Sequence, residues 1–341
     1  MRFLVHTILL LFLLAVPAAL PAQATAGGAS SAPSLTVDTD PVRAPAGKAP
    51  AFSGANRAER GYILHADVDE VVLNCTVLDG SQLVPNLKKQ DFQVFEDGVP
   101  QTIISFQHAD LPVSIALVVD NSGSMTDKRA AVSRAAMDLI EASNPEDEAF
   151  VVNFSDEAYL DQDFTSNITL LRSALDHIES RGGTALYDAV AASADKLAAD
   201  SRHPKQVIIL ITDGDDDAST LSLDQVIRRV QQLSGPVIYS IGLLFGGDMS
   251  RREEHQARNA LKELSTETGG VAFFPRDLAQ VDAIAAEVAR DIRNQYMLGY
   301  HSTKPASEPG FRRVLVKAHG RGLGRLTVRT RTGYFPAVRV R

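Results

Sequence analysis

Three oxygen-bearing side chains follow directly on an apolar run near the middle of the chain. The run covers residues 113–119, and Asp120, Ser122 and Ser124 come immediately after it. Alternate residues of a tight loop can direct their side chains to one point, and clusters made only of oxygens suit hard divalent cations such as Mg²⁺. The spacing therefore predicts a metal site at the end of a buried strand.

Two later segments supply further oxygens in a similar setting. Thr184 follows the stretch 181–183, which contains two glycines, and Asp213 follows the apolar run 208–212. The order D-x-S-x-S, then T, then D resembles the metal-ion-dependent adhesion site (MIDAS) of von Willebrand factor type A (VWA) domains. The resemblance implies Mg²⁺ as the cofactor, with Mn²⁺ or Ca²⁺ as alternatives, and one coordination position open to a partner. It assigns five ligands, in three loops: Asp120, Ser122 and Ser124, then Thr184, then Asp213.

Some of these residues are also consistent with other kinds of site. Taken alone, Asp120 is equally consistent with a helix cap, because acids at strand ends often cap the next helix. A phosphatase with an aspartyl nucleophile usually has a second acid two residues later, where Ser122 stands. No glycine-rich phosphate loop followed by Lys-Ser or Lys-Thr is present, so a Mg²⁺-dependent phosphoryl-transfer enzyme is the weaker alternative. We expect a protein that is not an enzyme and has no catalytic residues.

Three further acids, Asp215, Asp216 and Asp217, follow the third predicted ligand. They are consistent with a second Ca²⁺ site, or with a solvated acidic loop that caps a helix starting near residue 223. The pattern favours the solvated loop.

Composition limits the class of protein. The chain has 341 residues, 45% hydrophobic and 22% charged, which is typical of globular proteins with two or three domains. A net charge of −8 argues against general nucleic-acid binding. Cys75 is the only cysteine, so no intramolecular disulfide can form. Its alternation with Leu73 and Val77 predicts a buried thiol.

The first part of the sequence has the features of an export signal. Arg2, the apolar stretch 3–16 and the ending Ala22-Gln23-Ala24 predict a signal peptide over 1–24, cleaved near Ala24. Residues 25–59, rich in Ala, Gly, Ser and Pro, predict a disordered linker. We expect a periplasmic or secreted protein with no transmembrane segment in the mature chain; a retained anchor is the alternative.

The rest of the chain divides into three parts. Residues 60–110 alternate with period two and predict a β segment. Residues 111–300 alternate apolar strands with amphipathic helices, which predicts an α/β fold with a doubly wound, mostly parallel sheet. Residues 301–341 predict a β-hairpin, formed by 313–317 and 325–330, and a basic tail. Because the first β segment needs partners, we expect both flanks to form one small β-sandwich with the α/β domain inserted between them.

The individual elements of the α/β part follow from these periodicities. The expected helices cover 128–142, 170–178, 186–199, 223–233, 252–267 and 278–293, and the expected strands cover 113–119, 149–154, 207–211, 237–241 and 271–274.

Residues 60–335 as a whole resemble the bacterial, acidobacterial VWFA-related family. The motifs that carry this resemblance are Leu-Lys-Lys-Gln-Asp-Phe at 87–92, Glu-Asp-Gly at 96–98, Tyr-Met-Leu-Gly-Tyr at 296–300 and Gly-Tyr-Phe at 333–335. The resemblance implies a Rossmann-like VWA domain and a metal-dependent, adhesion-type module that binds an Asp or Glu carboxylate of a partner protein. A structural cell-envelope protein with a stabilising metal is the main rival. The basic tail predicts a solvated outer face, and contact with an anionic envelope surface stays open.

Overall fold

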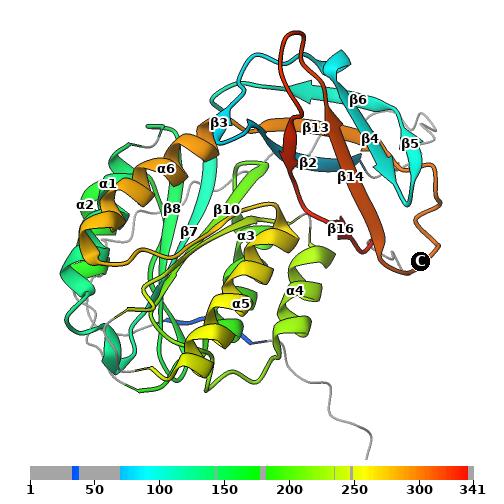
Figure 1. Ribbon diagram of the computed structural model, residues 1–341. Helices are drawn as coiled ribbons and strands as arrows, with labels where there is room; N and C mark the ends of the chain where they lie inside the picture. The colour runs from blue at the N-terminus through cyan, green and yellow to red at the C-terminus, as the bar shows by residue number, and fades with distance from the viewer. Residues whose placement is uncertain are drawn as a thin grey trace, which may run out of the picture. The chain divides into compact units, whose positions relative to one another are not determined.

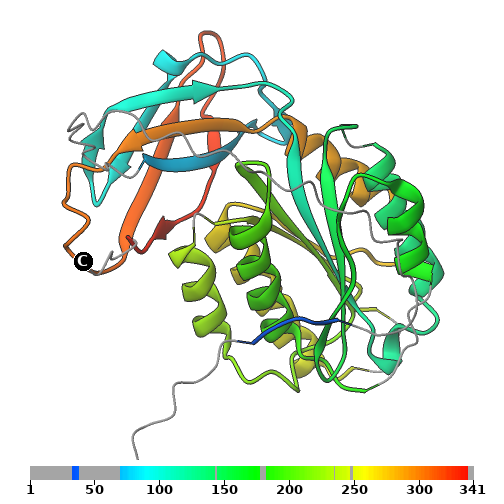
Figure 2. The same cartoon turned by 180° about the vertical axis from the view of Figure 1, so that it is seen from behind.

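The computed structural model describes residues 33–37, 70–142, 144–176, 182–233, 235–245 and 249–336. The predicted signal peptide 1–24 lies outside these residues, as does most of the predicted linker 25–59. Within that linker, however, Thr36–Val37 form a strand, β1, which pairs in parallel with β9 at the edge of a sheet (Figure 2). None of the helices among the described residues is long and apolar enough to cross a bilayer.

A seven-stranded sheet forms the centre of the α/β part. All eight residues of its strand β7 are buried, as expected for a strand covered on both faces. The strands other than β1 and β9 run parallel to one another, and β9 is antiparallel to β8. Their order across the sheet is β1, β9 (Ala158–Thr165), β8 (Glu148–Phe154), β7 (Val113–Asp120), β10 (Lys205–Thr212), β11 (Val237–Gly242) and β12 (Ala272–Phe273).

The α-helices of the described residues cover the two faces of this sheet (Figure 1). Residues of α1, α2 and α6 share one apolar core with one face of β7, and residues of α3, α4 and α5 share a second core with the opposite face. The helices are α1 (Arg129–Glu141), α2 (Ile168–Asp176), α3 (Leu186–Asp200), α4 (Leu223–Gln232), α5 (Arg251–Thr268) and α6 (Val281–Arg293). The predicted doubly wound, mostly parallel fold is confirmed.

Local sequence explains where α4 and α5 begin and where α5 ends. Ser222 and Gln225 form a reciprocal capping box at the start of α4, and Ser250 and Glu253 do the same for α5. Gly269 ends α5 in the left-handed region at φ 92°, which glycine adopts without the steric penalty of a Cβ. The acidic residues 215–217 therefore do not cap α4.

The remaining strands form a β-sandwich with its own apolar core. One sheet has the order β15, β2, β13, β6, with β3 also paired to β2, and the other has the order β16, β14, β4, β5. These strands are β2 (Glu70–Asp79), β3 (Gln82–Leu83), β4 (Phe92–Glu96), β5 (Val99–Gln101), β6 (Ile103–Gln107), β13 (Tyr296–His301), β14 (Arg312–Ala318), β15 (Thr327–Arg329) and β16 (Gly333–Tyr334). Short 3₁₀ turns cover Lys89–Asp91, Gly123–Met125 and Leu278–Gln280. Because β13 pairs with β2 and β6, and β14 pairs with β4, the two flanks form one sandwich, as predicted.

Two details of the flanks differ from the sequence-based expectation. Strand β13 falls within the range 111–300 expected for the α/β domain, but it is a central strand of the sandwich. The predicted hairpin is also wrong, because β14 pairs with β4 and β16 while β15 pairs with β2 in the opposite sheet. The connection 319–326 is long enough to cross between the two sheets, and the N-terminal flank offers each strand an antiparallel partner.

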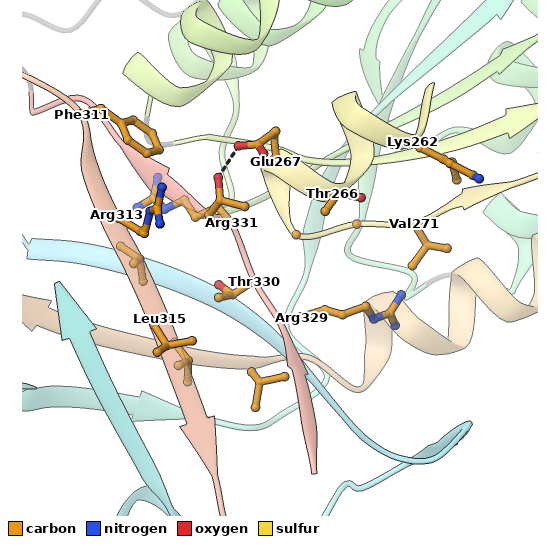
Figure 3. A pocket seen from close by; sticks show the side chains of 17 residues that line it. Lys262, Thr266, Glu267, Val271, Phe311, Arg313, Leu315, Arg329, Thr330 and Arg331 are labelled. Carbon is orange, nitrogen blue, oxygen red and sulfur yellow. Dashed lines mark hydrogen bonds between the residues drawn. The ribbon is translucent and has the colours of Figure 1, made fainter. Parts of the chain in front are cut away.

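Several basic residues of the C-terminal segment turn inward. Arg312 lies 3.6 Å from the buried carboxylate of Glu96, and Arg329 lies 2.9 Å from that of Asp291. Arg331 donates a hydrogen bond to the carbonyl of Val72 at 2.7 Å. The basic tail is therefore only partly a solvated face. The segment 328–332 also lines a cavity of about 710 Å³ together with Glu267, whose side chain bonds that of Thr332 (Figure 3).

Candidate metal centre

Asp120 is the last residue of β7, and its carboxylate is held from two sides. Its Oδ1 accepts a hydrogen bond from the backbone N–H of Ser122 at 2.8 Å, and its Oδ2 accepts one from the hydroxyl of Thr212 at 2.5 Å. Thr212 is the last residue of β10, which is the neighbour of β7 in the sheet. The two strand ends therefore fix the direction of this carboxylate.

The two serines link the first loop to the third. The hydroxyl oxygens of Ser122 and Ser124 lie 3.1 Å apart, and the Ser124 hydroxyl donates to Asp213 Oδ1 at 2.8 Å. Met125, buried in the core below, anchors the short 3₁₀ turn that carries Ser124. Four of the predicted ligands thus form one connected group of oxygens.

Thr184, the fifth predicted ligand, reaches the same place from the second loop. A Cβ atom added to Gly214 would lie 3.5 Å from the Thr184 hydroxyl oxygen and 4.0 Å from Asp120 Oδ2. One point beside Gly214 is therefore close to both oxygens. The structure brings all five predicted residues together at the carboxyl end of the sheet, where open α/β folds bind ligands.

The second loop is fixed by acids from neighbouring loops. Gly182 has φ 81°, and a side chain there would overlap the carboxylate of Asp156, which accepts a hydrogen bond from Gly183 N–H at 2.7 Å. Asp217 accepts from Thr184 N–H at 2.7 Å, and Asp216 accepts from Tyr187 N–H at 3.2 Å. Two acids of the run 215–217 therefore hold backbone N–H groups of the second loop and of α3.

The site is mostly withdrawn from solvent but reaches the surface at one residue. Asp120, Ser122, Thr184 and Asp213 are 2–6% exposed, whereas Ser124 is exposed. Burial raises the pKa of Asp120, hydrogen bonds from Thr212 and Ser122 act against this, and the nearby Asp213 carboxylate raises the pKa further. A cation beside the two carboxylates would offset this repulsion.

A basic residue that we did not predict as part of the site also touches it. Lys128, at the start of α1, places its Nζ 2.5 Å from Asp213 Oδ2. Its position four residues after Ser124 was the available signal. Thr212 was missed as well, although it directly precedes Asp213 in the sequence.

The donor set fits a hard divalent cation by its chemistry. All five predicted ligands offer oxygen, two as carboxylates and three as hydroxyls, which suits Mg²⁺, Mn²⁺ or Ca²⁺ better than softer metals. Among the described residues, no group of three or more His, Cys, Asp or Glu side chains is arranged so that it could hold a metal ion. The predicted site contains only two such residues, Asp120 and Asp213. The hydroxyl groups of Ser122, Ser124 and Thr184 would therefore have to supply the remaining metal ligands.

Comparison with known sequences gives a family match within the α/β part. Residues 115–215 match the family model of the von Willebrand factor type A domain. Among curated proteins, the chain is similar to inter-alpha-trypsin inhibitor heavy chain H4 of Bos taurus, with 26% identity over 212 residues that cover 56% of this chain and 22% of that protein. The Homo sapiens protein of that name is 27% identical over 176 residues, covering 48% and 18%. The chain thus spans about a fifth of the length of these relatives.

Comparison with solved structures gives more distant similarities. A von Willebrand factor type A protein from Catenulispora acidiphila is 14% identical with a TM-score of 0.45, covering 79% of this chain and 74% of that one. The pilus adhesin SpaC from Lactobacillus rhamnosus GG is 12% identical with a TM-score of 0.46, covering 72% and 47%.

Proposed function

Because residues 115–215 of the α/β part match the von Willebrand factor type A domain, we propose that the protein is an exported binding module that holds a partner's carboxylate through a divalent cation. The observation that carries this proposal is the connected group of buried carboxylates and hydroxyls at the carboxyl end of the sheet. Fold alone does not define a function, so the proposal rests on these side chains.

Five side chains would hold the cation: Asp120, Ser122, Ser124, Thr184 and Asp213. The two carboxylates supply negative charge and the three hydroxyls supply neutral oxygens. When bound, Mg²⁺, or Mn²⁺ or Ca²⁺ in its place, would keep residual positive charge and offer a coordination position to an external oxygen. These five residues would form a MIDAS-type site in which every ligand position of the motif is filled.

The partner that fits this site is a protein with an Asp or Glu side chain on its surface. Ser124 lies at the exposed rim, so an external carboxylate can approach the group from that side. A binding role needs no nucleophile or proton donor, and we assign no catalytic residue. The module would act in adhesion outside the cytoplasm, in the periplasm or as a secreted protein.

Metal titration is the direct test. Mg²⁺ and Mn²⁺ are titrated into the metal-stripped protein by calorimetry, and the melting temperature is followed in parallel. The parent should bind saturably, and Asp120→Ala should abolish binding. We expect that variant to lose only about 1 kcal/mol of folding free energy in the absence of metal, because the buried carboxylate is held by ordinary hydrogen bonds. Asp195→Asn, which removes a carboxylate paired with Arg229 on the helical surface, serves as the matched control.

A second experiment separates adhesion from a structural role. Proteins of the cell envelope are captured on the immobilised parent with Mg²⁺, with EDTA, and on Asp213→Ala. Capture that needs both the metal and Asp213 supports the binding module. Metal binding that raises the melting temperature without any metal-dependent capture would favour a structural envelope protein. Turnover of a phosphate ester that depends on Asp120 would instead favour an enzyme.

A further inference from the structure

Lys128 places a positive charge inside the group of proposed ligands. Its Nζ lies 2.5 Å from Asp213 Oδ2, and the side chains of the two residues are 17% and 0% exposed. The ammonium group also lies 5.6 Å from the ring centroid of Phe245. A charged pair this short and this buried is only weakly screened by solvent and salt.

The chain itself already engages both oxygens of the Asp213 carboxylate. Oδ1 accepts from the Ser124 hydroxyl at 2.8 Å, and Oδ2 is taken by Lys128. The proposed metal site requires Asp213 to give an oxygen to the cation. An ammonium group that stays on the same carboxylate would then repel a divalent cation across a short distance at low dielectric.

We infer that Lys128 is a tethered counter-cation that competes with the metal for Asp213 and thereby lowers the metal affinity of the site. This inference rests on the proposed function, because it concerns the same five ligands. In the metal-free protein the ammonium group neutralises the fully buried Asp213 carboxylate. Without it, that carboxylate would repel the Asp120 carboxylate with no positive charge nearby to compensate. When metal binds, the side chain has to leave Asp213.

The position of Lys128 in the fold makes such an exchange feasible. The residue precedes the first turn of α1, and 17% of its side chain is exposed, so the side chain already reaches solvent in part. Its neighbour Arg129 contacts a different group and donates to the Asn121 side chain at 2.9 Å. The competition for Asp213 is assigned to Lys128, whose ammonium group contacts that carboxylate.

The test compares three variants at this position. Lys128→Met and Lys128→Gln remove the charge, and the Gln side chain keeps a hydrogen-bond donor for Asp213 in case the Met variant folds poorly. Lys128→Arg keeps the charge. Lys196→Met is the matched control, because Lys196 pairs with Asp163 at 2.7 Å and is 13% exposed, but lies in α3 outside the site.

Mn²⁺ affinity is measured by calorimetry on the metal-stripped proteins, and melting temperatures are measured with and without Mn²⁺. We expect the two neutral variants to bind Mn²⁺ with a dissociation constant lower by about tenfold or more. They should also melt at a lower temperature than the parent without metal, and gain more on adding it. Lys128→Arg and Lys196→Met should keep the parent's affinity.

The outcomes separate this inference from the proposed function. If the parent binds Mn²⁺ and the neutral variants bind it no more tightly, the inference is wrong and the metal site stands. If only the neutral variants bind, Lys128 blocks the site, so the inference stands while the metal-dependent function of the parent fails. If none of the proteins binds Mn²⁺, both are overturned.

Discussion

Lys205 places an ammonium group in the protein interior at the start of β10. The residue is 2% exposed, and its Nζ donates a hydrogen bond to the carbonyl of Ile292. Burial and, to a lesser extent, the Arg293 guanidinium lower the pKa of Lys205 to about 8, against the opposite effect of Asp110, Asp147 and Asp291. The charged form is therefore less favourable in the folded protein than in the unfolded chain.

The pH dependence of stability should reveal this cost. Between pH 8 and 10.5 the unfolded chain binds more protons at Lys205 than the folded protein does, so the free energy of unfolding rises with pH through this group. Relative to the parent, Lys205→Met should be more stable at pH 7, and this advantage should shrink by up to about 3 kcal/mol as the pH rises from 8 to 10.5. Urea unfolding of both proteins at several pH values measures the difference.

Comparing the variant with the parent removes the effects of other groups. Burial raises the pKa of Cys75 to about 12, so that this thiol destabilises the fold as the pH rises above 9 in both proteins. Burial also lowers the pKa of Lys196, but its hydrogen bonds to Asp163 and Asp200 outweigh this and raise it. Lys196→Met should therefore be destabilising at pH 7. For Lys205→Met, a difference in the free energy of unfolding from the parent that stays the same at every pH would contradict a lowered pKa of Lys205.

The predicted ligands were accessible to sequence reasoning because each of the three loops that carry them directly follows an apolar run or contains a pair of glycines. The parallel strands β7 and β10 bring such positions together at one edge of the sheet whatever the details of the loops. The roles of Lys128 and Thr212 were not accessible in this way, since they depend on the direction of individual side chains. Whether the group binds metal stays a prediction.

At the scale of elements, Gly269 joins the end of α5 to the C-terminal segment. Its φ is 92°, and a Cβ atom there would lie 2.7 Å from backbone atoms of Thr330 and Arg331. The backbone N–H of Thr332 bonds the carbonyl of Glu267 in the last turn of the same helix, at 3.2 Å. This glycine is therefore required both by the helix end and by the chain that passes it.

Substitution of two glycines separates these requirements. Gly269→Ala should lower the free energy of unfolding by more than about 2 kcal/mol, because strain at positive φ adds to a clash with the backbone. Gly80 has φ 62° but no atom within 4 Å of an added Cβ, so Gly80→Ala should cost only about 1 kcal/mol. Chemical denaturation measures both. Equal losses would mean that the contact with Thr330 and Arg331 contributes nothing.

The missed strand and the misassigned hairpin have separate causes. Strand β9 carries Asp161, Gln162 and Asp163 and is mostly half-buried, so its sequence lacks the apolar run that marks β7. The predicted hairpin failed because alternation identifies a strand but not its partner. Long apolar runs and amphipathic helices were predictable, whereas the pairing of β14 and β15 depends on contacts between distant parts of the chain.

At the scale of the whole molecule, the sandwich and the α/β part have separate apolar cores. Neighbouring residues of β14 offer a matched test of their independence, because Val316 is 5% exposed and Leu315 is 51% exposed. Val316→Asp buries a carboxylate in the sandwich core and should remove hydrogen-exchange protection from 70–107 and 296–301. Strands β7, β8 and β10 should stay protected. Leu315→Asp should leave both parts protected, and loss of protection in all strands of Val316→Asp would indicate a single cooperative unit.

The register of the sandwich implies an order in which its parts become stable. Gln107 of β6 is paired with Met297 of the antiparallel strand β13. The entire α/β domain therefore connects the two strands, in the position that the loop of a hairpin would have. A disordered loop of that length would make the pairing unfavourable through its closure entropy, by about 0.6 kcal/mol for each doubling in length. Once folded, the α/β domain holds the two ends together as a short turn would. The sandwich can therefore unfold while the α/β domain stays folded. When the α/β domain unfolds, however, the pairing of β6 with β13 has to bear the closure entropy of a long disordered loop.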